Sequence, residues 1–250
     1  MKLSLRSLDK NYTGPDGKTI RALSGCSLEV TGGSFTAIAG KSGCGKTTLL
    51  KVIAGLLQSD SGSVEFTGMR EGEIRPKTGI MFQDHRLLPW LTVEQNLALA
   101  FPLPKNNSEK IKIHGEIMRV LAMTGIADRS SSLPHELSGG MAQRAALARC
   151  LCRNPDLLLL DEPLGSLDTF TRFRLREELE KLWLELGITV ILVTHDIEEA
   201  VFFGERVFLM NNGMVECEVP VSLPRPRNRS LPEFQDYCRK IMQQVTEDKR

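Results

Sequence analysis

The chain has 250 residues, of which 41% are hydrophobic and 25% are charged, as in a globular protein with a sizeable core. Its formal net charge is +1, so the composition provides no electrostatic reason to expect a nucleic-acid partner. No apolar run approaches the roughly 18 residues of a membrane-spanning helix, and the start, MKLSLRSLDKNY, lacks the apolar core of a signal peptide. If the protein works at a membrane, we therefore expect a partner to hold it there.

Strand-like and helical stretches alternate along the chain, which is typical of an α/β protein. The runs LLLL at 157–160 and VILV at 190–193 are apolar throughout, which favours strands of a sheet that is covered on both faces. In chain order, the predicted strands are 2–8, 27–30, 35–39, 63–66, 79–82, 156–160, 189–193, 206–210 and 214–218.

Helical patterns fill much of the remaining chain. In RLREELEKLWLEL, residues 174–186, apolar side chains recur at spacings of three and four and therefore share one face. Residues 84–150 contain no convincing strand and predict a helical subdomain inserted in the α/β core. Near the C-terminus a connector rich in Pro and Arg, LPRPRNRS at 223–230, precedes a predicted amphipathic helix at 231–245.

The six cysteines follow none of the spacings of a zinc site. We therefore expect most of them to be small, buried residues of a protein in a reducing compartment. Cys44 differs from the others because it lies inside a glycine-rich loop.

That loop, GKSGCGKTTLL at 40–50, matches the phosphate-binding pattern G-x-x-x-x-G-K-[ST]. It follows an apolar strand and opens a predicted helix, which is the context that the pattern requires. Glycines let the backbone N–H groups turn toward phosphate oxygens, Lys46 can reach the β- and γ-phosphates, and the Thr47 hydroxyl can ligate Mg²⁺. The predicted nucleotide contacts are Gly40, Lys41, Ser42, Gly43, Cys44, Gly45, Lys46, Thr47 and Thr48.

A second motif, LLLLDEP at 157–163, is a buried strand that ends in two carboxylates. Asp161 is a candidate to hold Mg²⁺, and Glu162 is a candidate to polarise the water that attacks the γ-phosphate. The alternative is an ordinary strand-to-loop transition with solvated acids. A phosphate loop in the same chain favours the catalytic interpretation.

A third motif, ELSGGMAQR at 136–144, places a glycine pair at a predicted helix start. Ser138 is a candidate N-cap, while Gly139 and Gly140 can expose N–H groups to an anion. Taken alone, the motif would indicate a plain helix cap. Upstream of the acid pair, however, LSGG resembles the signature of the ATP-binding-cassette (ABC) family.

The resemblance implies a P-loop NTPase core of the ABC-ATPase type, with an antiparallel β subdomain and an inserted helical subdomain. It assigns residues 1–220 to the ATPase domain, with the helical subdomain at 84–150, and residues 221–250 to a short basic linker and C-terminal helix. It also implies ATP and Mg²⁺ as ligands. Two identical subunits would sandwich ATP between the Lys46 loop of one and the LSGG motif of the other.

Four further positions take their roles from this resemblance. Gln83 matches the glutamine loop that senses Mg²⁺ and the attacking water, and His195 matches the switch histidine at the γ-phosphate. Asp168 matches the loop that crosses to the partner subunit, and Tyr12 resembles the aromatic residue that stacks on adenine. The chain departs from the commonest pattern at Met141, where glutamine is frequent.

Several segments are similar to the ATPase subunits of bacterial nitrate, sulfonate and taurine importers, namely MFQDHRLLPWLTVEQNL at 81–97, DEPLGSLDTFTR at 161–172, THDIEEAV at 194–201 and the tail LPRPRNRS at 223–230. Related importers for bicarbonate, cyanate or thiamine-precursor pyrimidines carry similar subunits, so the cargo is left open. The resemblance implies a peripheral protein on the cytoplasmic face of the bacterial inner membrane. Its partners would be integral-membrane permease subunits and, indirectly, a solute-binding protein, with no nucleic acid.

Other classes of P-loop protein fit the sequence less well. A soluble cassette ATPase of DNA repair or translation usually carries coiled-coil insertions or a second cassette, and neither occurs here. A P-loop kinase does not account for LSGG, and an exporter would carry a fused membrane domain. For an importer motor we expect HRLLPWLTVEQNLAL, residues 85–99, to receive a permease helix through Leu87, Leu88 and Trp90, with Leu91 and Leu97 in the core.

Overall fold

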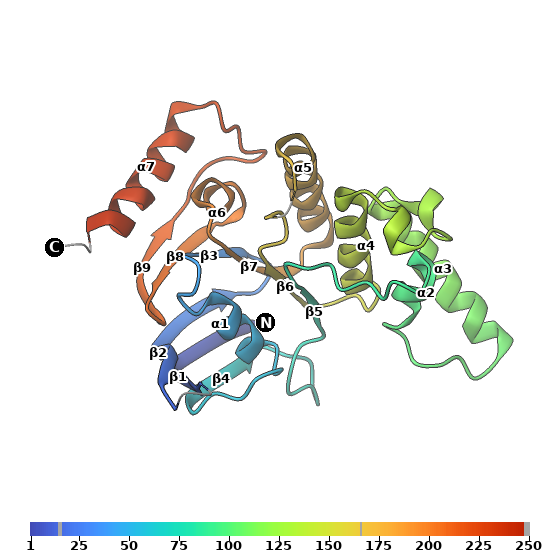
Figure 1. The fold of residues 1–250 in the computed structure, drawn as a ribbon, viewed down its shortest axis with the longest axis horizontal. Coiled ribbons are helices and arrows are strands. Elements are labelled where there is room, and N and C mark those ends of the chain that lie inside the picture. Colours follow the sequence, from blue (N-terminus) through green and yellow to red (C-terminus); the bar gives the residue numbers. More distant parts are fainter. Residues whose placement is uncertain (15–16, 166, 248–250) are drawn as a thin grey trace. The chain divides into compact units, whose positions relative to one another are not determined.

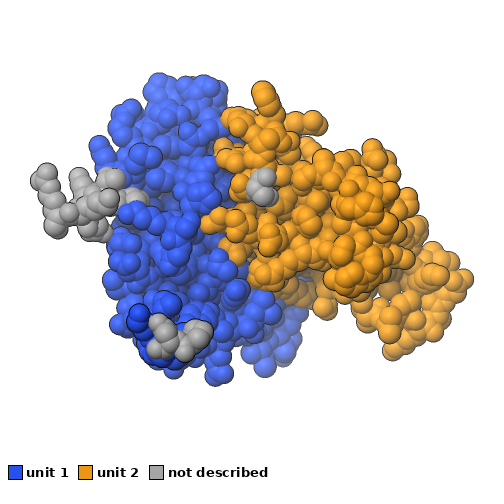
Figure 2. Space-filling model, viewed as in Figure 1, with its two compact units in different colours: residues 1–76, 189–250 blue, residues 77–188 orange. Residues whose placement is uncertain are grey.

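A computed structural model describes residues 1–14, 17–165 and 167–247, with the side chains of 245–247 left aside. The chain divides into two compact units, Met1–Pro76 with Thr189–Arg250 and Lys77–Ile188 (Figure 2). The first unit is therefore built from two separate stretches of sequence, and the second is the stretch between them.

The first unit contains a three-stranded antiparallel sheet in the order β2-β1-β4 (Figure 1). Its strands are β1 (Lys2–Thr13), β2 (Thr19–Thr31) and β4 (Ser61–Thr67). β1 and β2 extend beyond the predicted 2–8 and 27–30, because polar residues without alternation continue the antiparallel pairing as far as Thr13 and Thr19. Ion pairs also occur on this extension, from Arg21 to Asp9 and from Lys10 to Asp60.

A second sheet of this unit runs in the order β7-β3-β8-β9. Its strands are β3 (Phe35–Ala39), β7 (Thr189–Thr194), β8 (Arg206–Asn211) and β9 (Met214–Pro220). β3 lies parallel to both β7 and β8, and β9 returns antiparallel to β8. Every residue of β3 and β7 is buried, as expected for continuous apolar strands at the centre of a sheet.

Three helices belong to the first unit: α1 (Lys46–Ile53), α6 (Ile197–Phe203) and α7 (Pro232–Glu247). α6 packs against β3 and β7, where the rings of Phe35 and Phe203 stack with centroids 4.8 Å apart. α7 packs against α6 and confirms the predicted C-terminal helix. The sheet and these helices form a core that holds the carboxyl ends of the parallel strands in place.

The second unit contains the parallel pair β5 (Thr78–Met81) and β6 (Leu157–Asp161). Its helices are α2 (Val93–Ala98), α3 (Asn107–Met123), α4 (Gly139–Leu151) and α5 (Thr169–Leu186), with short 3-10 turns at Ala127–Arg129 and Pro134–Glu136. Residues 84–150, which the structure describes throughout, hold helices and no strand, as the sequence predicts. Among the described helices, none combines the length and apolar character needed to cross a bilayer.

The predicted patterns otherwise match the observed elements. All nine predicted strands are present, and α5 buries Leu175, Leu179, Leu182 and Trp183. The six cysteines are free thiols; five are buried and Cys217 is half-buried. Burial raises the pKa of the Cys150 and Cys152 thiols to about 12, so both stay protonated at neutral pH.

Candidate nucleotide-binding and catalytic site

The phosphate loop joins the end of β3 to the start of α1, and two of its three glycines, Gly40 and Gly45, are required by close backbone contacts. A Cβ at Gly40 would lie 2.2 Å from the carbonyl oxygen of Met210, and one at Gly45 would lie 2.2 Å from that of Ala22. Gly45 also has a φ of 105°, in the left-handed region that favours glycine. The loop therefore wraps tightly, with its N–H groups at the N-terminus of α1, where anions are favoured.

Lys46 is the first residue of α1, at the end of this loop, and is only 4% exposed. Its ammonium donates to the carbonyl oxygens of Gly40 at 2.8 Å and Lys41 at 2.9 Å. These two bonds fix the charge inside the concave side of the loop. An ammonium held in a loop of this kind is suited to the terminal phosphates of a nucleotide.

His195 lies at the same edge of the sheet as the phosphate loop. It follows β7, whose last residue, Thr194, is paired with Ala39 at the end of β3. The Gly40 N–H donates to the Thr194 carbonyl oxygen at 3.3 Å, so the loop and the turn that carries His195 are joined directly. The His195 side chain is exposed. Within the first unit, the structure thus brings together two predicted site elements that are about 150 residues apart in the sequence.

Tyr12 lies on β1 opposite Ile20 of β2 and is 40% exposed. The same β2 strand contributes Ala22, whose carbonyl oxygen limits the space at Gly45. Tyr12 is therefore on the strand next to the one that contacts the phosphate loop. Its ring is accessible to a planar ligand such as adenine.

In the second unit, the predicted residues follow the parallel strands β5 and β6. Met81 at the end of β5 is paired with Leu160, the residue before Asp161. Gln83 lies two residues beyond β5 and is exposed, whereas Asp161 ends β6 and is 5% exposed. Because the carboxyl ends of parallel strands meet at one edge, Gln83 and the acid pair share that edge.

Glu162 has a backbone conformation that is unusual for its residue type. Its φ is 46°, in the left-handed region, and its carbonyl oxygen accepts the Gly165 N–H at 3.2 Å. Such a conformation costs on the order of 1–3 kcal/mol in a residue other than glycine, and it concentrates at functional sites. Because of this φ, the Glu162 side chain leaves the backbone in a direction that it would not have if β6 continued through this residue.

The LSGG motif begins α4. The Ser138 hydroxyl accepts the Met141 N–H at 3.3 Å, which confirms the predicted N-cap. A Cβ at Gly140 would lie 2.5 Å from the Thr171 side chain, so close packing requires glycine there. Two residues beyond Met141, the Gln143 amide donates to the Gln83 carbonyl oxygen at 3.4 Å. The signature helix and the glutamine segment are thus linked, a contact that the sequence did not suggest.

Asp168 is the N-cap of α5, and its carboxylate accepts the Thr171 N–H at 3.1 Å. Hydrogen bonds from Thr171, above all from its side chain, lower the pKa of the Asp168 carboxyl. This exposed carboxylate is ionised at neutral pH. Its capping role is structural and compatible with the predicted contact to a partner subunit.

Residues 23–165 match the family model described as ABC transporter. The chain belongs to this ABC transporter family. It is 44% identical over 227 residues, which are 91% of this chain and 77% of the relative, to the aliphatic sulfonates import ATP-binding protein SsuB of Ralstonia nicotianae. It is 40% identical over 247 residues, 98% of this chain and 96% of the relative, to an SsuB protein of Bacillus cereus.

A solved structure of an ATP-binding cassette, a post-hydrolysis dimer bound to ADP and Pi, superposes with a TM-score of 0.73 at 33% identity. The match covers 89% of this chain and all of that one. These similarities confirm the predicted ABC-ATPase fold and identify this ABC chain as a nucleotide-binding ATPase of a membrane-associated transporter. The kinase and DNA-repair alternatives are not supported.

Proposed function

We propose that this ABC ATPase powers a bacterial importer of aliphatic sulfonates or a related small solute from the cytoplasmic face of the inner membrane. The observation that carries the nucleotide part is the buried Lys46 ammonium inside a phosphate loop bonded to the His195 turn. The cargo class is supported by relatives at 40–44% identity that are named for aliphatic sulfonate import.

In the first unit, we assign three roles around ATP. The loop 40–48 and the Lys46 ammonium bind the β- and γ-phosphates, and Tyr12 stacks on the adenine ring. His195 contacts the γ-phosphate from the neighbouring strand end. The Lys46 charge is supplied by a side chain that is already fixed, so little reorganisation is needed during the reaction.

In the second unit, Glu162 would polarise the attacking water and Gln83 would orient it. Mg²⁺ supplies charge neutralisation at the phosphates when it is bound. In the second unit, the Asp161 carboxylate and the Gln83 amide oxygen are hard oxygen donors, the type of ligand that Mg²⁺ prefers, and in the first unit the Thr47 hydroxyl is a donor of the same type. Each of these side chains is therefore chemically suited to this ion.

Two copies of the chain would form the working enzyme. The exposed Ser138 and Gly139 at the start of α4 would complete the site around ATP held by the Lys46 loop of the other copy, and Asp168 would cross at the same interface. The solved cassette with 33% identity is itself a dimer. ATP is then the ligand that joins two copies, and its hydrolysis releases them.

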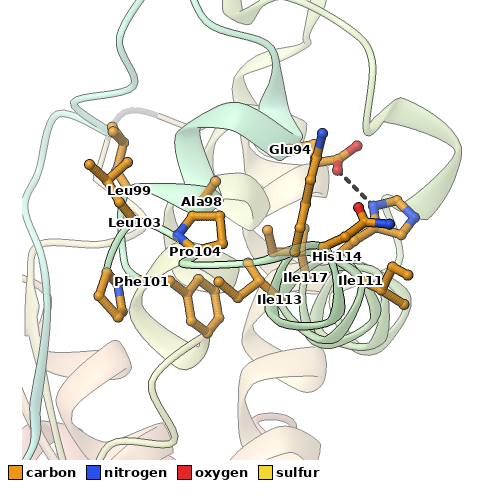
Figure 3. Close-up of a pocket in the computed structure, with 13 residues that line it drawn as sticks. Glu94, Ala98, Leu99, Phe101, Leu103, Pro104, Ile111, Ile113, His114 and Ile117 are labelled. Carbon is orange, nitrogen blue, oxygen red and sulfur yellow. Dashed lines mark hydrogen bonds and ion pairs between the residues drawn. The ribbon is translucent and has the colours of Figure 1, made fainter.

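A permease is the second proposed partner. Trp90 is 70% exposed on the segment that follows Gln83, and the adjoining helices α2 and α3 border an apolar groove of about 650 Å³. Figure 3 shows Leu99, Phe101 and Ile113 around this groove, with the Glu94–His114 pair beside it. An exposed aromatic residue and an apolar groove are each features that can hold an amphipathic helix of a membrane subunit. A solute-binding protein would act on the opposite side of that permease.

The experiment for the nucleotide part compares Lys46→Ala with Glu162→Gln. Lys46→Ala should abolish ATP hydrolysis, because it removes the charge that holds the phosphates. Glu162→Gln should bind ATP and hydrolyse it about a hundredfold or more slowly, because it keeps the charge clamp and loses the group that polarises water. Nucleotide binding and phosphate release should be measured separately for each variant.

The matched controls are Lys51→Ala on the same helix and Glu177→Gln on α5, which should hydrolyse ATP like the unchanged protein. Glu162→Gln should also accumulate as an ATP-bound dimer in size-exclusion chromatography. Full activity of Lys46→Ala, or equal loss of ATP binding in Glu162→Gln, would contradict the assigned roles.

A further inference from the structure

Thr194, the last residue of β7, has a side chain held by two hydrogen bonds. Its hydroxyl oxygen accepts the Asp196 N–H at 3.0 Å, and its hydroxyl proton is donated to the carboxylate of Glu199. Because a backbone N–H can only donate, the hydroxyl must accept from Asp196. Its single proton is then left for the carboxylate, and the rotamer of Thr194 is set by Glu199.

Glu199 is a rigid anchor for this bond. It is 3% exposed on α6, and its own N–H donates to the Asp196 side chain, the N-cap of that helix, at 3.2 Å. At the other end of α6, the buried Arg227 guanidinium donates to the carbonyl oxygens of Val201, Phe202 and Gly204. The helix is thus fixed at both ends, and the carboxylate has little freedom to move.

The backbone of Thr194 connects Glu199 to two parts of the nucleotide site in the first unit, the phosphate loop and His195. Its carbonyl oxygen accepts the N–H of Gly40, the first glycine of the phosphate loop. The next residue is His195, whose side chain is exposed at the strand end. A change in the Thr194 side chain would therefore be transmitted over one peptide bond to His195.

We propose that Glu199 is a positioning residue for ATP hydrolysis. It holds the Thr194 hydroxyl, and through it the turn 194–196 that presents His195 beside the phosphate loop. It does not touch the nucleotide itself. The inference rests on the proposed role of His195, and a displacement of that side chain by about 1 Å would lower the rate of hydrolysis by one to two orders of magnitude.

Two matched pairs of variants test this inference. Glu199→Gln keeps an oxygen acceptor for the Thr194 hydroxyl, whereas Glu199→Met has similar length and offers only a weak sulfur acceptor. Thr194→Ser keeps the hydroxyl, whereas Thr194→Val keeps the shape and loses it. We expect kcat to fall about tenfold or more in Glu199→Met and Thr194→Val, and by less than about threefold in the Gln and Ser variants. KM for ATP should change little in all four, because the Lys46 loop is retained.

A purely structural role would lower the melting temperature and leave kcat of the folded protein unchanged, which would overturn the inference. The His195→Ala background distinguishes the role of Glu199 from the role of His195 itself. If Glu199 acts through His195, Glu199→Met should lower kcat no further in that background. Normal kcat in His195→Ala would refute the role of His195 itself, while loss in His195→Ala with normal kcat in Glu199→Met would refute only the role of Glu199.

Discussion

Asn96 is fully buried on α2, and its amide holds the irregular segment that precedes this helix. The amide oxygen accepts the Leu88 N–H at 2.7 Å, and the amide nitrogen donates to the carbonyl oxygens of Leu88, Leu91 and Thr92 at 3.0–3.1 Å. Backbone groups that would otherwise pair in a helix or strand are satisfied here by one side chain. The segment after Gln83 therefore has a defined conformation although it has no regular structure.

Asn96→Ala should destabilise the protein by about 3 kcal/mol or more, since it leaves several backbone groups without their partner. Asn96→Asp should be at least as harmful, because a carboxylate would face three carbonyl oxygens. Urea unfolding measures both. Asn107→Ala, on the exposed first residue of α3, is the control and should change stability by less than about 0.5 kcal/mol. If both Asn96 variants were as stable as the unchanged protein, the amide would not be needed, and water would replace its hydrogen bonds.

For single residues, the sequence predicts the roles of those that belong to motifs. It does not predict the roles of residues that act through buried hydrogen bonds. Lys46, Ser138 and Asp161 stand in recognisable patterns, and their local surroundings agree with those patterns. Asn96 and Glu199 lie inside the segments 81–97 and 194–201 that resemble importer ATPases, but the resemblance assigned neither of them a role. Nothing local distinguishes a buried amide or carboxylate from a solvated one, because its partners come from other elements or from neighbouring turns.

Among the elements, the segment 85–92 shows how the structure refines a prediction from sequence. Leu87, predicted to contact a permease, is 6% exposed and is therefore part of the core, which corrects that assignment. Leu97 is fully buried, as predicted, and Leu91 is half-buried. Trp90, at 70% exposed, is the exposed large hydrophobic residue of this segment. Pro89 and the Asn96 bonds to Leu88 and Leu91 restrain the backbone on both sides of Trp90, which the apolar pattern alone could not specify.

Trp90→Asp should therefore weaken assembly with the permease and reduce solute uptake about tenfold or more, because an exposed aromatic anchor is lost. Folding and basal ATP hydrolysis of the isolated subunit should remain normal, since the side chain is largely solvated. Leu184→Asp, at a 54%-exposed apolar position of α5, is the matched control and should leave uptake unchanged. Uptake and co-purification with the permease measure the effect. Normal uptake with Trp90→Asp would place the docking surface elsewhere.

The strands of the first unit differ in how accurately their ends could be predicted from the sequence. The apolar β3 and β7 were predicted within one residue, because continuous burial leaves an unambiguous pattern. β1 and β2 were predicted too short, since their outer halves are polar. These halves pair through their main chains, with an ion pair between Arg21 and Asp9. Alternation reports burial on one face, and it disappears where both faces of a strand meet solvent.

For the molecule as a whole, the central claim is that two copies share each ATP. The sequence contains two glycine-bearing helix starts, at Lys46 and at Ser138, and only one of them carries a lysine. The structure places the start of α1 in the first unit and the start of α4 in the second. The loop before α1 has the form of an anion-binding site. Which copy's LSGG motif completes a given site is a property of the assembly. No feature of a single chain can report it, so it requires a direct measurement.

That measurement compares two mixed dimers, each isolated with a different affinity tag on each chain. One pairs Lys46→Ala with Ser138→Arg, and the other pairs the unchanged chain with the double variant carrying both substitutions. If sites are shared, the first dimer has one intact site and the second has none. ATP hydrolysis should then appear in the first, at about half the rate of the unchanged dimer if the sites act independently, and be absent from the second. Hydrolysis by the second dimer with none by the first would show that each copy completes its own site, and would contradict the account.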